Sequence, residues 1–388
     1  MLHTFLKTSA STAVLLALTS SAFAFESSAV FERLKAQIAL QGLTLSAKNV
    51  VEENNGVTLE GVKFSPEGVD GFTIDKIMLE DITDAQNDGF KIGRIVIPGF
   101  ATETDGVKLD FGGAQMLGYF IAGPNETDPM LKGNLYEQFS TGALDITVGG
   151  KKAFSFGSSL TSVTPYTAGG TLEYDMSIND VTADFSVSPD PKTREVMEQL
   201  GYTTLKGEMT AKGSWNTQSG LLTMKPMKIA TVDAADLSIE LELGGYTPAL
   251  IDGLQKMQET MKGNEQAMGM AMLGLAQQLD IRQLAIMIDD NSLTVRLLEF
   301  FGGQQGMDAA GAAAFAKGML PLGLAQLGNP AFAQSTAAAV SAFLDDPKNL
   351  RIEAAPAAPV PFASLMAGAM GDPRTLIDIL AVKVTANQ

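Results

Sequence analysis

The chain has 388 residues, a formal net charge of −17 at pH 7, no cysteine and a single histidine. The acidic balance, without a basic cluster, argues against binding to nucleic acid and against charge-driven binding to anionic lipid. The absence of cysteine excludes disulfides and thiolate chemistry, and the length allows a large core in one elongated domain or in two.

Residues 1–24 have the composition of a secretory signal peptide. Lys7 gives a basic start, residues 13–18 form a short apolar core, and Ala22-Phe23-Ala24 matches a cleavage site. The apolar core is too short to span a bilayer, and no cysteine follows it that could carry a lipid. We predict a cleaved signal, a mature chain without a transmembrane helix that begins at Phe25, and a periplasmic location.

The mature chain then lacks histidine as well as cysteine, because the one histidine is His3. Ser-His-Asp catalysis, Cys-His catalysis and ordinary zinc sites need these residue types. The chain also has no Gly-x-Ser-x-Gly, Ser-x-x-Lys, Gly-x-Gly-x-x-Gly or P-loop motif. We therefore predict no enzymatic activity and no cofactor, and we assign no catalytic, cofactor-binding or metal-binding residue. The residues that bind a ligand stay unspecified.

The first predicted element of the mature chain is a helix over residues 28–41. Its apolar residues recur at a spacing of four, which places them on one stripe. Ser27 or Ser28 can cap its start, and Gly42 ends it. An irregular strand over residues 43–51 follows.

The chain is organised around residues 56–111, where one pattern repeats. A glycine is followed by apolar residues at a step of two, then a step of three, then a step of two again. The full pattern starts at Gly56, Gly71 and Gly89, and a shorter copy starts at Gly106. A step of two is the period of a strand with one buried face, so we predict neighbouring strands joined by tight turns.

The step of three lies at the same place in each full repeat. It moves the second half of the strand to the opposite face, unless a bulge absorbs one residue. We predict a bend, bulge or face switch at Glu60-Gly61, Asp75-Lys76 and Gly93-Arg94, aligned across neighbouring strands.

Strand patterns continue to residue 243 and make the first two thirds of the mature chain mainly antiparallel β. Apolar and polar residues alternate over residues 144–148, 172–187 and 202–243. A polar loop at residues 123–134 and a short helix at residues 192–200 interrupt them.

The composition changes at Gly244-Gly245 and becomes rich in alanine and methionine. Thr247, followed by Pro248, is predicted to cap a methionine-rich helix that breaks at Gly263-Asn264. The remaining predictions are a strand at 284–288, helices at 309–322, 331–344, 362–370 and 373–379, and strands at 350–354 and 380–384. Charged, proline and amide residues interrupt the alanine-rich helices, so we do not expect them to span a membrane. They are either closely packed helices or a surface helix pair over a groove, and close packing is favoured because alanine and glycine let helices approach.

The predicted fold class is therefore α+β. An antiparallel β-rich body of repeated strands, as a curved sheet or a sandwich, occupies residues 25–244 after the signal peptide at 1–24. A mainly helical region with short strands, residues 245–388, packs on it and ends in a closing strand.

Three acidic clusters were weighed as sites. Residues 84–89 and 289–291 carry oxygen ligands of the kind that calcium prefers, but neither has the spacing of an EF-hand loop. Residues 52–55 hold a pair of glutamates, yet no pocket can be assigned to them. All three fit solvated turns at the ends of strands better.

Two apolar features allow a ligand site or an ordinary core. The methionines of residues 257–272 (Met257, Met261, Met268, Met270 and Met272) could adapt to varied apolar ligands, but core packing of an amphipathic helix is the favoured interpretation. The apolar residues of the repeats could line an open groove for acyl chains, and here a closed sandwich core is favoured.

The C-terminal segments resemble the tail of α-proteobacterial periplasmic proteins, in residues 297–301, 306–310, 328–331, 343–347, 359–363 and 384–387. The repeated strands that begin with glycine are similar to those of AsmA-like and YdgA-like (DUF945-type) envelope proteins. The resemblance brings no catalytic residue with it. It implies a periplasmic β-rich body, with an apolar concave side, in outer-membrane lipid homeostasis or transport. The chain is shorter than AsmA-like proteins and lacks their membrane anchor once the signal is cleaved, which favours a soluble carrier or a structural role over a bridging conduit.

Three functions follow as hypotheses. The first is a non-enzymatic periplasmic protein that binds apolar ligands, above all lipid, on a sheet covered by helices. The second is an envelope structural or assembly factor with a closed core and protein partners. The third and weakest is a hydrolase that works with carboxylates alone. The shape of the sheet, open or closed, separates the first two.

Overall fold

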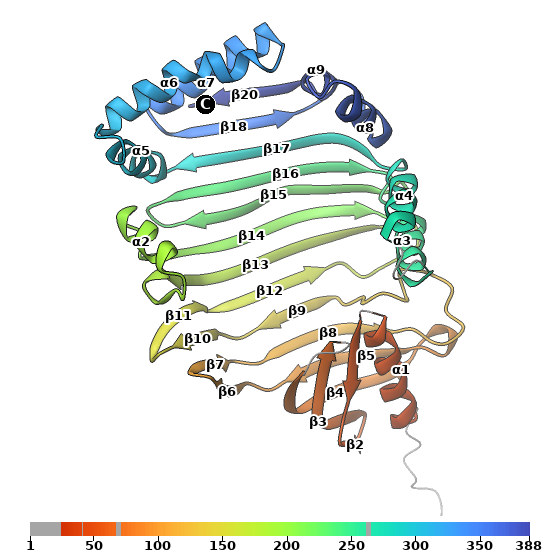
Figure 1. Ribbon diagram of the computed structural model, residues 1–388. Helices are drawn as coiled ribbons and strands as arrows, with labels where there is room; N and C mark the ends of the chain where they lie inside the picture. Colours follow the sequence, from red (N-terminus) through yellow and green to blue (C-terminus); the bar gives the residue numbers. More distant parts are fainter. Residues whose placement is uncertain (1–24, 41, 67–70, 261–264) are drawn as a thin grey trace, which may run out of the picture.

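The computed structural model describes residues 25–40, 42–66, 71–260 and 265–388. Within these residues a single open antiparallel sheet holds all twenty strands, and nine α-helices lie mostly in the C-terminal part (Figure 1). The predicted α+β class, with a β-rich body, a helical region and a closing strand, is confirmed. The signal peptide predicted at residues 1–24 and the helix break predicted at Gly263-Asn264 lie outside the described residues and stay predictions.

The N-terminal half of the chain is built almost entirely from strands. A first helix precedes them, and 3₁₀ turns follow β4 and β13. In chain order the elements are α1 (Ser27–Ala39), β1 (Leu43–Ser46), β2 (Asn49–Glu53), β3 (Gly56–Pro66), β4 (Phe72–Asp84), η1 (Gln86–Asp88), β5 (Phe90–Ile97), β6 (Phe100–Thr104), β7 (Val107–Phe111), β8 (Ala114–Ile121), β9 (Gln138–Thr141), β10 (Leu144–Val148), β11 (Lys151–Phe156), β12 (Ser158–Val163), β13 (Thr171–Asp184) and η2 (Phe185–Val187).

The C-terminal half adds longer strands and the remaining helices. These elements are α2 (Pro191–Gln199), β14 (Thr204–Asn216), β15 (Leu221–Thr231), β16 (Ala235–Gly244), α3 (Pro248–Thr260), α4 (Glu265–Ala276), β17 (Asp280–Asp290), α5 (Leu293–Gly303), α6 (Ala309–Ala325), α7 (Pro330–Asp345), β18 (Asn349–Ala354), β19 (Val360–Pro361), α8 (Phe362–Gly371), α9 (Thr375–Ile379) and β20 (Val382–Ala386). The strands on both sides of residue 244 belong to the same sheet, because β16 pairs with β17.

The sheet is a meander in which each long strand pairs with the next one in the chain. β5 with β6, β7 with β8, β9 with β10 and β11 with β12 are the two halves of four long strands. Their register is continuous across the joints; Ile97 pairs with Ala114 and Phe100 with Phe111, for example. This connectivity needs only hairpin turns, as expected for antiparallel strands.

A glycine crease crosses the sheet at these joints, and it consists of Gly99, Gly112, Gly142 and Gly157. A Cβ atom on Gly112 would lie 2.9 Å from the backbone nitrogen of Ala143, and one on Gly142 would lie 2.8 Å from the carbonyl oxygen of Gly112. Glycine is therefore required where the neighbouring backbones approach closely at the bend.

The breaks predicted inside the repeated strands are confirmed, but their alignment in one line is wrong. Pairing of β3 with β4 is interrupted at Gly61, opposite Asp75, and pairing of β4 with β5 at Asp81, opposite Gly93. Gly61 and Asp81 have φ angles of 57° and 55°. β4 thus carries two breaks six residues apart, because its pairing with β3 and its pairing with β5 are interrupted at different positions along the strand.

The consequence of each break is that both halves of a strand bury their apolar residues in one core. A left-handed residue breaks the regular alternation. Val57 and Leu59 before Gly61, and Val62 after it, all lie in the same buried cluster. The step of three in the sequence is therefore the signature of a strand that bends around a core.

Helix α1 packs on β1, β2 and β8 and closes the N-terminal core. Its predicted serine cap is wrong. The residue before the helix is Glu26, and the Ser28 hydroxyl donates to the Glu26 carboxylate at 2.9 Å instead of accepting from the backbone. Gly42 follows the helix as predicted, with a φ of 73°.

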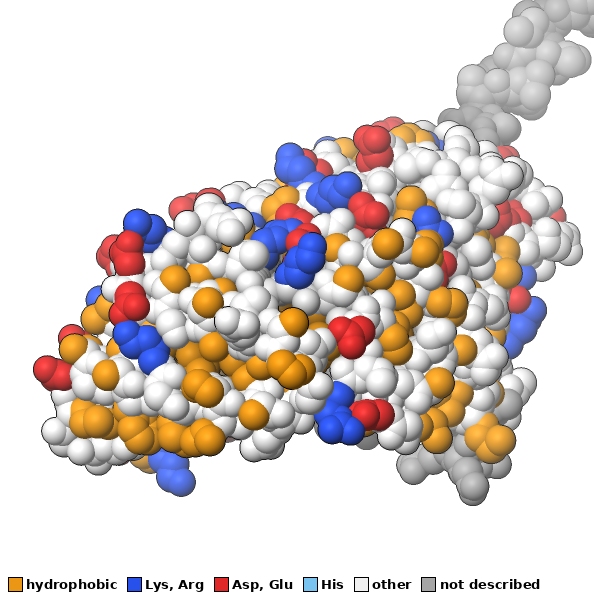
Figure 2. All heavy atoms as spheres, turned by 90° about the horizontal axis from the view of Figure 1, so that it is seen from above, with side chains coloured by type: hydrophobic (Ala, Val, Ile, Leu, Met, Phe, Trp, Pro, Cys, Tyr) orange, Lys and Arg blue, Asp and Glu red, His pale blue; other side chains and the backbone are white. Residues whose placement is uncertain are grey.

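The C-terminal helices lie at the ends of the strands and at the last edge of the sheet. The predicted cap by Thr247 is confirmed, because its Oγ1 accepts from the backbone nitrogen of Leu250 at 3.3 Å. Helix α7 lies along β20 at the end of the sheet, with α6 beside it (Figure 1), and Figure 2 shows hydrophobic side chains gathered along one margin of this end. Among the described residues no helix is long and apolar enough to cross a bilayer.

Two strand boundaries differ from those predicted, and one long strand is irregular. The strand predicted at 284–288 is longer in the structure, as β17. The closing strand, predicted at 380–384, begins only at Val382, because Leu380 ends α9 and Ala381 has a φ of 48°. β15 is one strand with an irregularity beside Pro226, which cannot donate a ladder hydrogen bond.

Candidate functional site

Apolar side chains cover one face of the sheet between β14 and β20. Side chains alternate along each strand, and the register aligns apolar residues of neighbouring strands in rows across the sheet. We call this surface the apolar trough, and it consists of three rows: Met209, Ile229, Leu237, Ile288 and Leu350; Met227, Ile239, Ile286, Ile352 and Val384; and Met224, Leu241, Leu284, Ala354 and Val382.

The apolar trough is open to solvent in its middle. Ile229, Leu284 and Ile286 are each 38% exposed, and Ile352 is 46% exposed. Central residues of a β-sandwich are covered by the opposite sheet. The sheet stays single here, and the helices lie at its margins. The closed core was expected for the repeats of residues 56–111, and there the apolar residues are buried, although under α1 and the bent strands of one sheet and not between two sheets.

One wall of the trough stands at the strand ends that carry α3. Leu172, Trp215 and Leu222, which are paired neighbours on the apolar face, pack with Ile251 of α3. The indole nitrogen of Trp215 donates to the carbonyl oxygen of Tyr246 at 2.6 Å, which ties the strand to the start of the helix. The wall is thus a hydrophobic cluster with a satisfied polar group.

The other wall stands at the opposite strand ends. Leu205 of β14 packs with residues of α2 and α5, among them Met197 and Leu297. The Arg296 guanidinium lies 4.3 Å from the centre of the Tyr202 ring and donates to the carbonyl oxygen of Gly201 at 2.8 Å. Helices therefore flank the trough at both ends of its strands, as Figure 1 shows, and leave its middle free.

The reverse face of the same strands is charged. Lys228 pairs with Asp236 at 2.8 Å, and Arg351 pairs with Glu240 and Glu353 at 3.0 Å each. The hydrogen bond from Lys228 to Asp236 raises the pKa of that ammonium, and those to Glu240 and Glu353 raise the pKa of the Arg351 guanidinium. The sheet therefore has one hydrocarbon face and one face of ion pairs.

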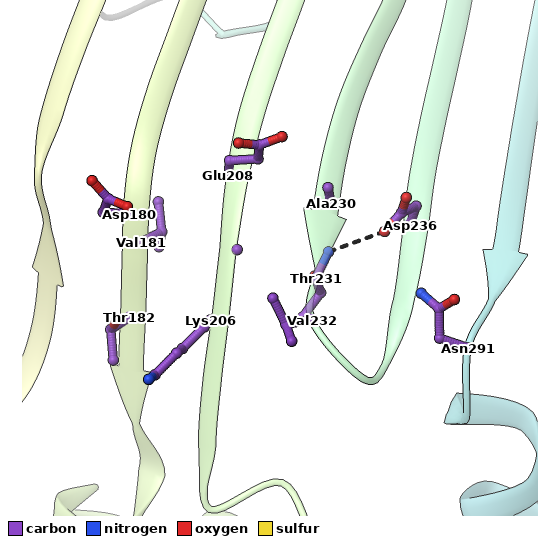
Figure 3. Close-up of a pocket in the computed structure, with 11 residues that line it drawn as sticks. Asp180, Val181, Thr182, Lys206, Glu208, Ala230, Thr231, Val232, Asp236 and Asn291 are labelled. Carbon is purple, nitrogen blue, oxygen red and sulfur yellow. Dashed lines mark hydrogen bonds between the residues drawn. The ribbon is translucent and has the colours of Figure 1, made fainter.

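A pocket of about 550 Å³ lies at one end of β13 to β16, beside the turn into α5. Its carboxylates, Asp180, Glu208 and Asp236, come from three strands and lie apart (Figure 3). Asp236 already accepts from the Thr231 backbone nitrogen at 3.2 Å and pairs with Lys228. The pocket brings no two carboxylates together for acid–base work, and in the described part of the chain no group of three or more acidic side chains lies close enough to hold a metal.

The acidic clusters weighed from the sequence have structural roles. Residues 86–88 form the turn η1, where Asn87 donates to the Glu126 carboxylate at 3.0 Å. Asp290 accepts from the backbone nitrogen and hydroxyl of Thr294, at 2.8 and 2.6 Å, and so caps the first turn of α5. The glutamates of residues 52–55 end β2 before its turn.

The two methionine-rich helices, α3 and α4, differ in whether their methionines pack in the core or face solvent. Met257 of α3 is buried and packs as core, as favoured. Met270 and Met272 of α4 are exposed, so core packing is wrong for that helix. Met261 lies outside the described residues.

The trough itself was the feature missing from the sequence interpretation. The alternation of residues 237–243 and 284–288 contributes to it, but by itself this alternation predicts only strands. A single strand shows that it has one apolar face, but the rows appear only when the register of six strands is known.

Comparison with known proteins gives one match. A family model described as an uncharacterized protein matches residues 228–387. No curated protein matches the chain. The matched segment runs from the end of β15 to the end of β20 and includes α3 to α9, so it covers the greater part of the trough and both helices of the α6–α7 pair.

Proposed function

We propose that this protein is a non-enzymatic periplasmic protein that holds the acyl chains of lipids in the apolar trough and serves in envelope lipid homeostasis. The observation that carries the proposal is the exposure of Ile229, Leu284, Ile286 and Ile352 in the middle of an otherwise continuous apolar face. The signal-like residues 1–24 and the resemblance of the repeated strands to AsmA-like and YdgA-like envelope proteins support the location and the class of ligand.

The dimensions of the trough suit hydrocarbon chains. Each row crosses five strands, and strands lie about 4.8 Å apart, so a row is about 19 Å long. The acyl chains of one bilayer leaflet span about 15 Å. A chain laid along a row would contact side chains of several strands at once.

The chemistry of the lining predicts weak selectivity for the head group. Burial of apolar surface contributes about 25 cal/mol per Å² and has no direction. The three rows contain only Val, Leu, Ile, Met and Ala, while Lys228, Arg351 and their partners project from the reverse face. Lipids with different head groups should therefore bind with similar affinity, and no nucleophile or acid faces the bound chain.

Native mass spectrometry of the purified protein tests the proposal. The double variant Ile286→Asn/Ile352→Asn places two amides in the middle row, and Met287→Asn places one on the reverse face of the same strand. Burying an amide without a partner costs about 1–3 kcal/mol, so lipid occupancy should fall at least about 10-fold in the double variant. It should be unchanged in Met287→Asn.

A lipid-free mass for the unmodified protein under gentle ionisation would sink the proposal. Crosslinking that recovers one protein partner over the trough, without lipid, would favour an envelope assembly factor instead. The open trough already departs from the closed core that this alternative was built on.

A further inference from the structure

The outer face of α6 has no polar side chain. Every exposed position of this helix is alanine, glycine, proline or one of three large apolar residues. Phe315, Met319 and Leu322 are 53%, 48% and 64% exposed, and their spacing of four and three places them on one stripe. A helix that faces water normally carries its polar residues there, so this face is suited to an apolar environment.

The surroundings of this stripe are nearly free of charge. Residues 309–344, which include all of α6 and nearly all of α7, contain one charged residue, Lys317, in a chain of net charge −17. The Lys317 ammonium pairs with Asp345. The acidity that would keep the rest of the molecule away from a phospholipid surface is therefore absent here.

The position of the helix pair joins this face to the trough. The rows end at β20, and the side-chain amide of Asn387, just after β20, donates to the carbonyl oxygens of Ala342 and Asp346 in and after α7, at 3.1 and 2.9 Å. Between α6 and α7 lies an apolar pocket of about 520 Å³, lined by residues such as Leu324, Ala333 and Ala337. Figure 2 looks onto this end of the molecule.

We propose that the α6 face is a membrane-docking surface whose partner is a lipid bilayer. The helix would lie in the interfacial plane, with Phe315, Met319 and Leu322 among the acyl chains, and would bring the end of the trough to its source of lipid. The supply of lipid to the trough rests on the proposed function, while the docking itself does not.

The absence of polar groups favours a bilayer over a protein. Protein interfaces have a polar rim and about one hydrogen bond per 100–200 Å², and the exposed positions of α6 offer no side-chain donor or acceptor. A helix that lies in the membrane interface buries an apolar face at the boundary between head groups and acyl chains, and the stripe of Phe315, Met319 and Leu322 supplies such a face. The attraction is apolar, so it should hold for zwitterionic lipid and persist at high salt.

Flotation of the full chain with phosphatidylcholine vesicles tests the docking. The variant Phe315→Ser/Met319→Ser/Leu322→Ser should bind vesicles at least about 10-fold more weakly, because three apolar contacts are lost. The control Leu40→Ser/Val196→Ser/Val232→Ser removes three exposed apolar residues, from the end of α1, from α2 and from the β15–β16 turn, and it should bind like the unmodified protein. Residues 1–24 are the same in all three proteins, so they cannot cause a difference.

Other results would overturn the docking. The unmodified protein could fail to float, or the α6 variant could float as well as the control. Sedimentation could show a dimer that the α6 variant dissociates, in which case a second copy of this chain covers the face. Circular dichroism checks that both variants fold. Native mass spectrometry separates this proposal from the proposed function, because the α6 variant should still carry lipid loaded during expression if the trough binds it.

Discussion

Both halves of the sheet have strands with one apolar face, but the two halves differ in how much of that face other parts of the chain cover. In the N-terminal half, Leu59, Ile92 and Ile121 have no exposed surface, because α1 and the bent strands enclose them. In the C-terminal half, the paired residues Ile286 and Ile352 lie on the apolar face of their strands and remain exposed. An alternating strand therefore predicts one apolar face, and what covers that face is decided elsewhere in the chain.

The difference lies in where the helices begin and end. Helix α1 directly precedes β1, and a short connection at Gly42 folds it back on the strands that follow. In the other half, α2, α3 and α5 join successive strands at their ends, so each helix packs beside a strand end. These helices therefore cover residues near the strand ends and leave the centre of each long strand open.

Matched isoleucine truncations give the largest expected contrast between the halves. Ile92→Ala should lower the free energy of unfolding by about 2–5 kcal/mol, because it leaves a cavity in a closed core. Ile286→Ala should lower it by about 1 kcal/mol or less, because the site is half open and leaves no enclosed cavity. Urea denaturation of both variants measures the difference. An equal, large loss for Ile286→Ala would mean that the trough is covered in solution.

Glu126, in the loop between β8 and β9, gives the next largest expected effect. This carboxylate is buried and accepts from the backbone nitrogens of Thr127 and Asp128, at 2.8 Å each, and from the Asn87 side chain. Glu126→Gln loses charge-assisted hydrogen bonds and should cost about 1–3 kcal/mol at pH 7. The exposed Glu137→Gln, which loses one surface ion pair with Lys91, should cost less than about 1 kcal/mol.

The cost of Glu126→Gln should depend on pH. Burial alone raises the pKa of Glu126, but the hydrogen bonds from Asp128, Asn87, Thr127 and Gln86 outweigh it, so the pKa lies below its usual value. An unfolded glutamate has a pKa of about 4.3, and the unfolded state binds more protons between the two values. The stabilisation is therefore complete above the unfolded value and is lost as the pH falls through the folded one. Urea denaturation at pH 7 and pH 3 should show the difference between variant and parent shrinking.

A smaller effect should be equal at two irregularities of the sheet. Asp81 in β4 and Asp180 in β13 have φ angles of 55° and 57°, and each faces a glycine, Gly93 or Gly157, on a neighbouring strand. Glycine adopts this conformation without the Cβ penalty. Asp81→Gly and Asp180→Gly should therefore each stabilise by up to about 1 kcal/mol. Asp75→Gly, at a position without a positive φ, serves as the control in thermal denaturation and should destabilise.

The local features of this fold that depend only on residues adjacent in the sequence could be predicted from the sequence. The repeats starting at Gly56, Gly71 and Gly89 indicated strands with a break, and the structure places left-handed residues at Gly61 and Asp81. The cap by Thr247 also depends only on adjacent residues.

Features that depend on distant pairing could not be predicted. The two breaks of β4 lie at different heights because β3 and β5 pair with it in different registers, which no single strand encodes. The trough has the same origin: Ile239, Ile286 and Ile352 are separated by 113 residues of chain and meet only through the pairing of β16, β17 and β18. The apolar outer face of α6 was visible as alanine and glycine, and close helix packing was the expected reason for it. The exposure of Phe315, Met319 and Leu322 contradicts that reason for the outer side.

The smallest expected effect on stability comes from the charged face. Lys228 and Ile229 are adjacent in β15, and their side chains project from opposite faces of the sheet, Lys228 on the charged face and Ile229 in the trough. Lys228→Ala removes a partly exposed ion pair with Asp236 and should change the free energy of unfolding by less than about 1 kcal/mol, since solvent screens such pairs. It should leave lipid occupancy unchanged in native mass spectra. Ile229→Asn should also have little effect on stability, yet it places an amide in the first row of the trough and should reduce lipid occupancy. Equal lipid loss in both variants would mean that lipid does not distinguish the two faces, and the apolar trough would then not be the binding surface.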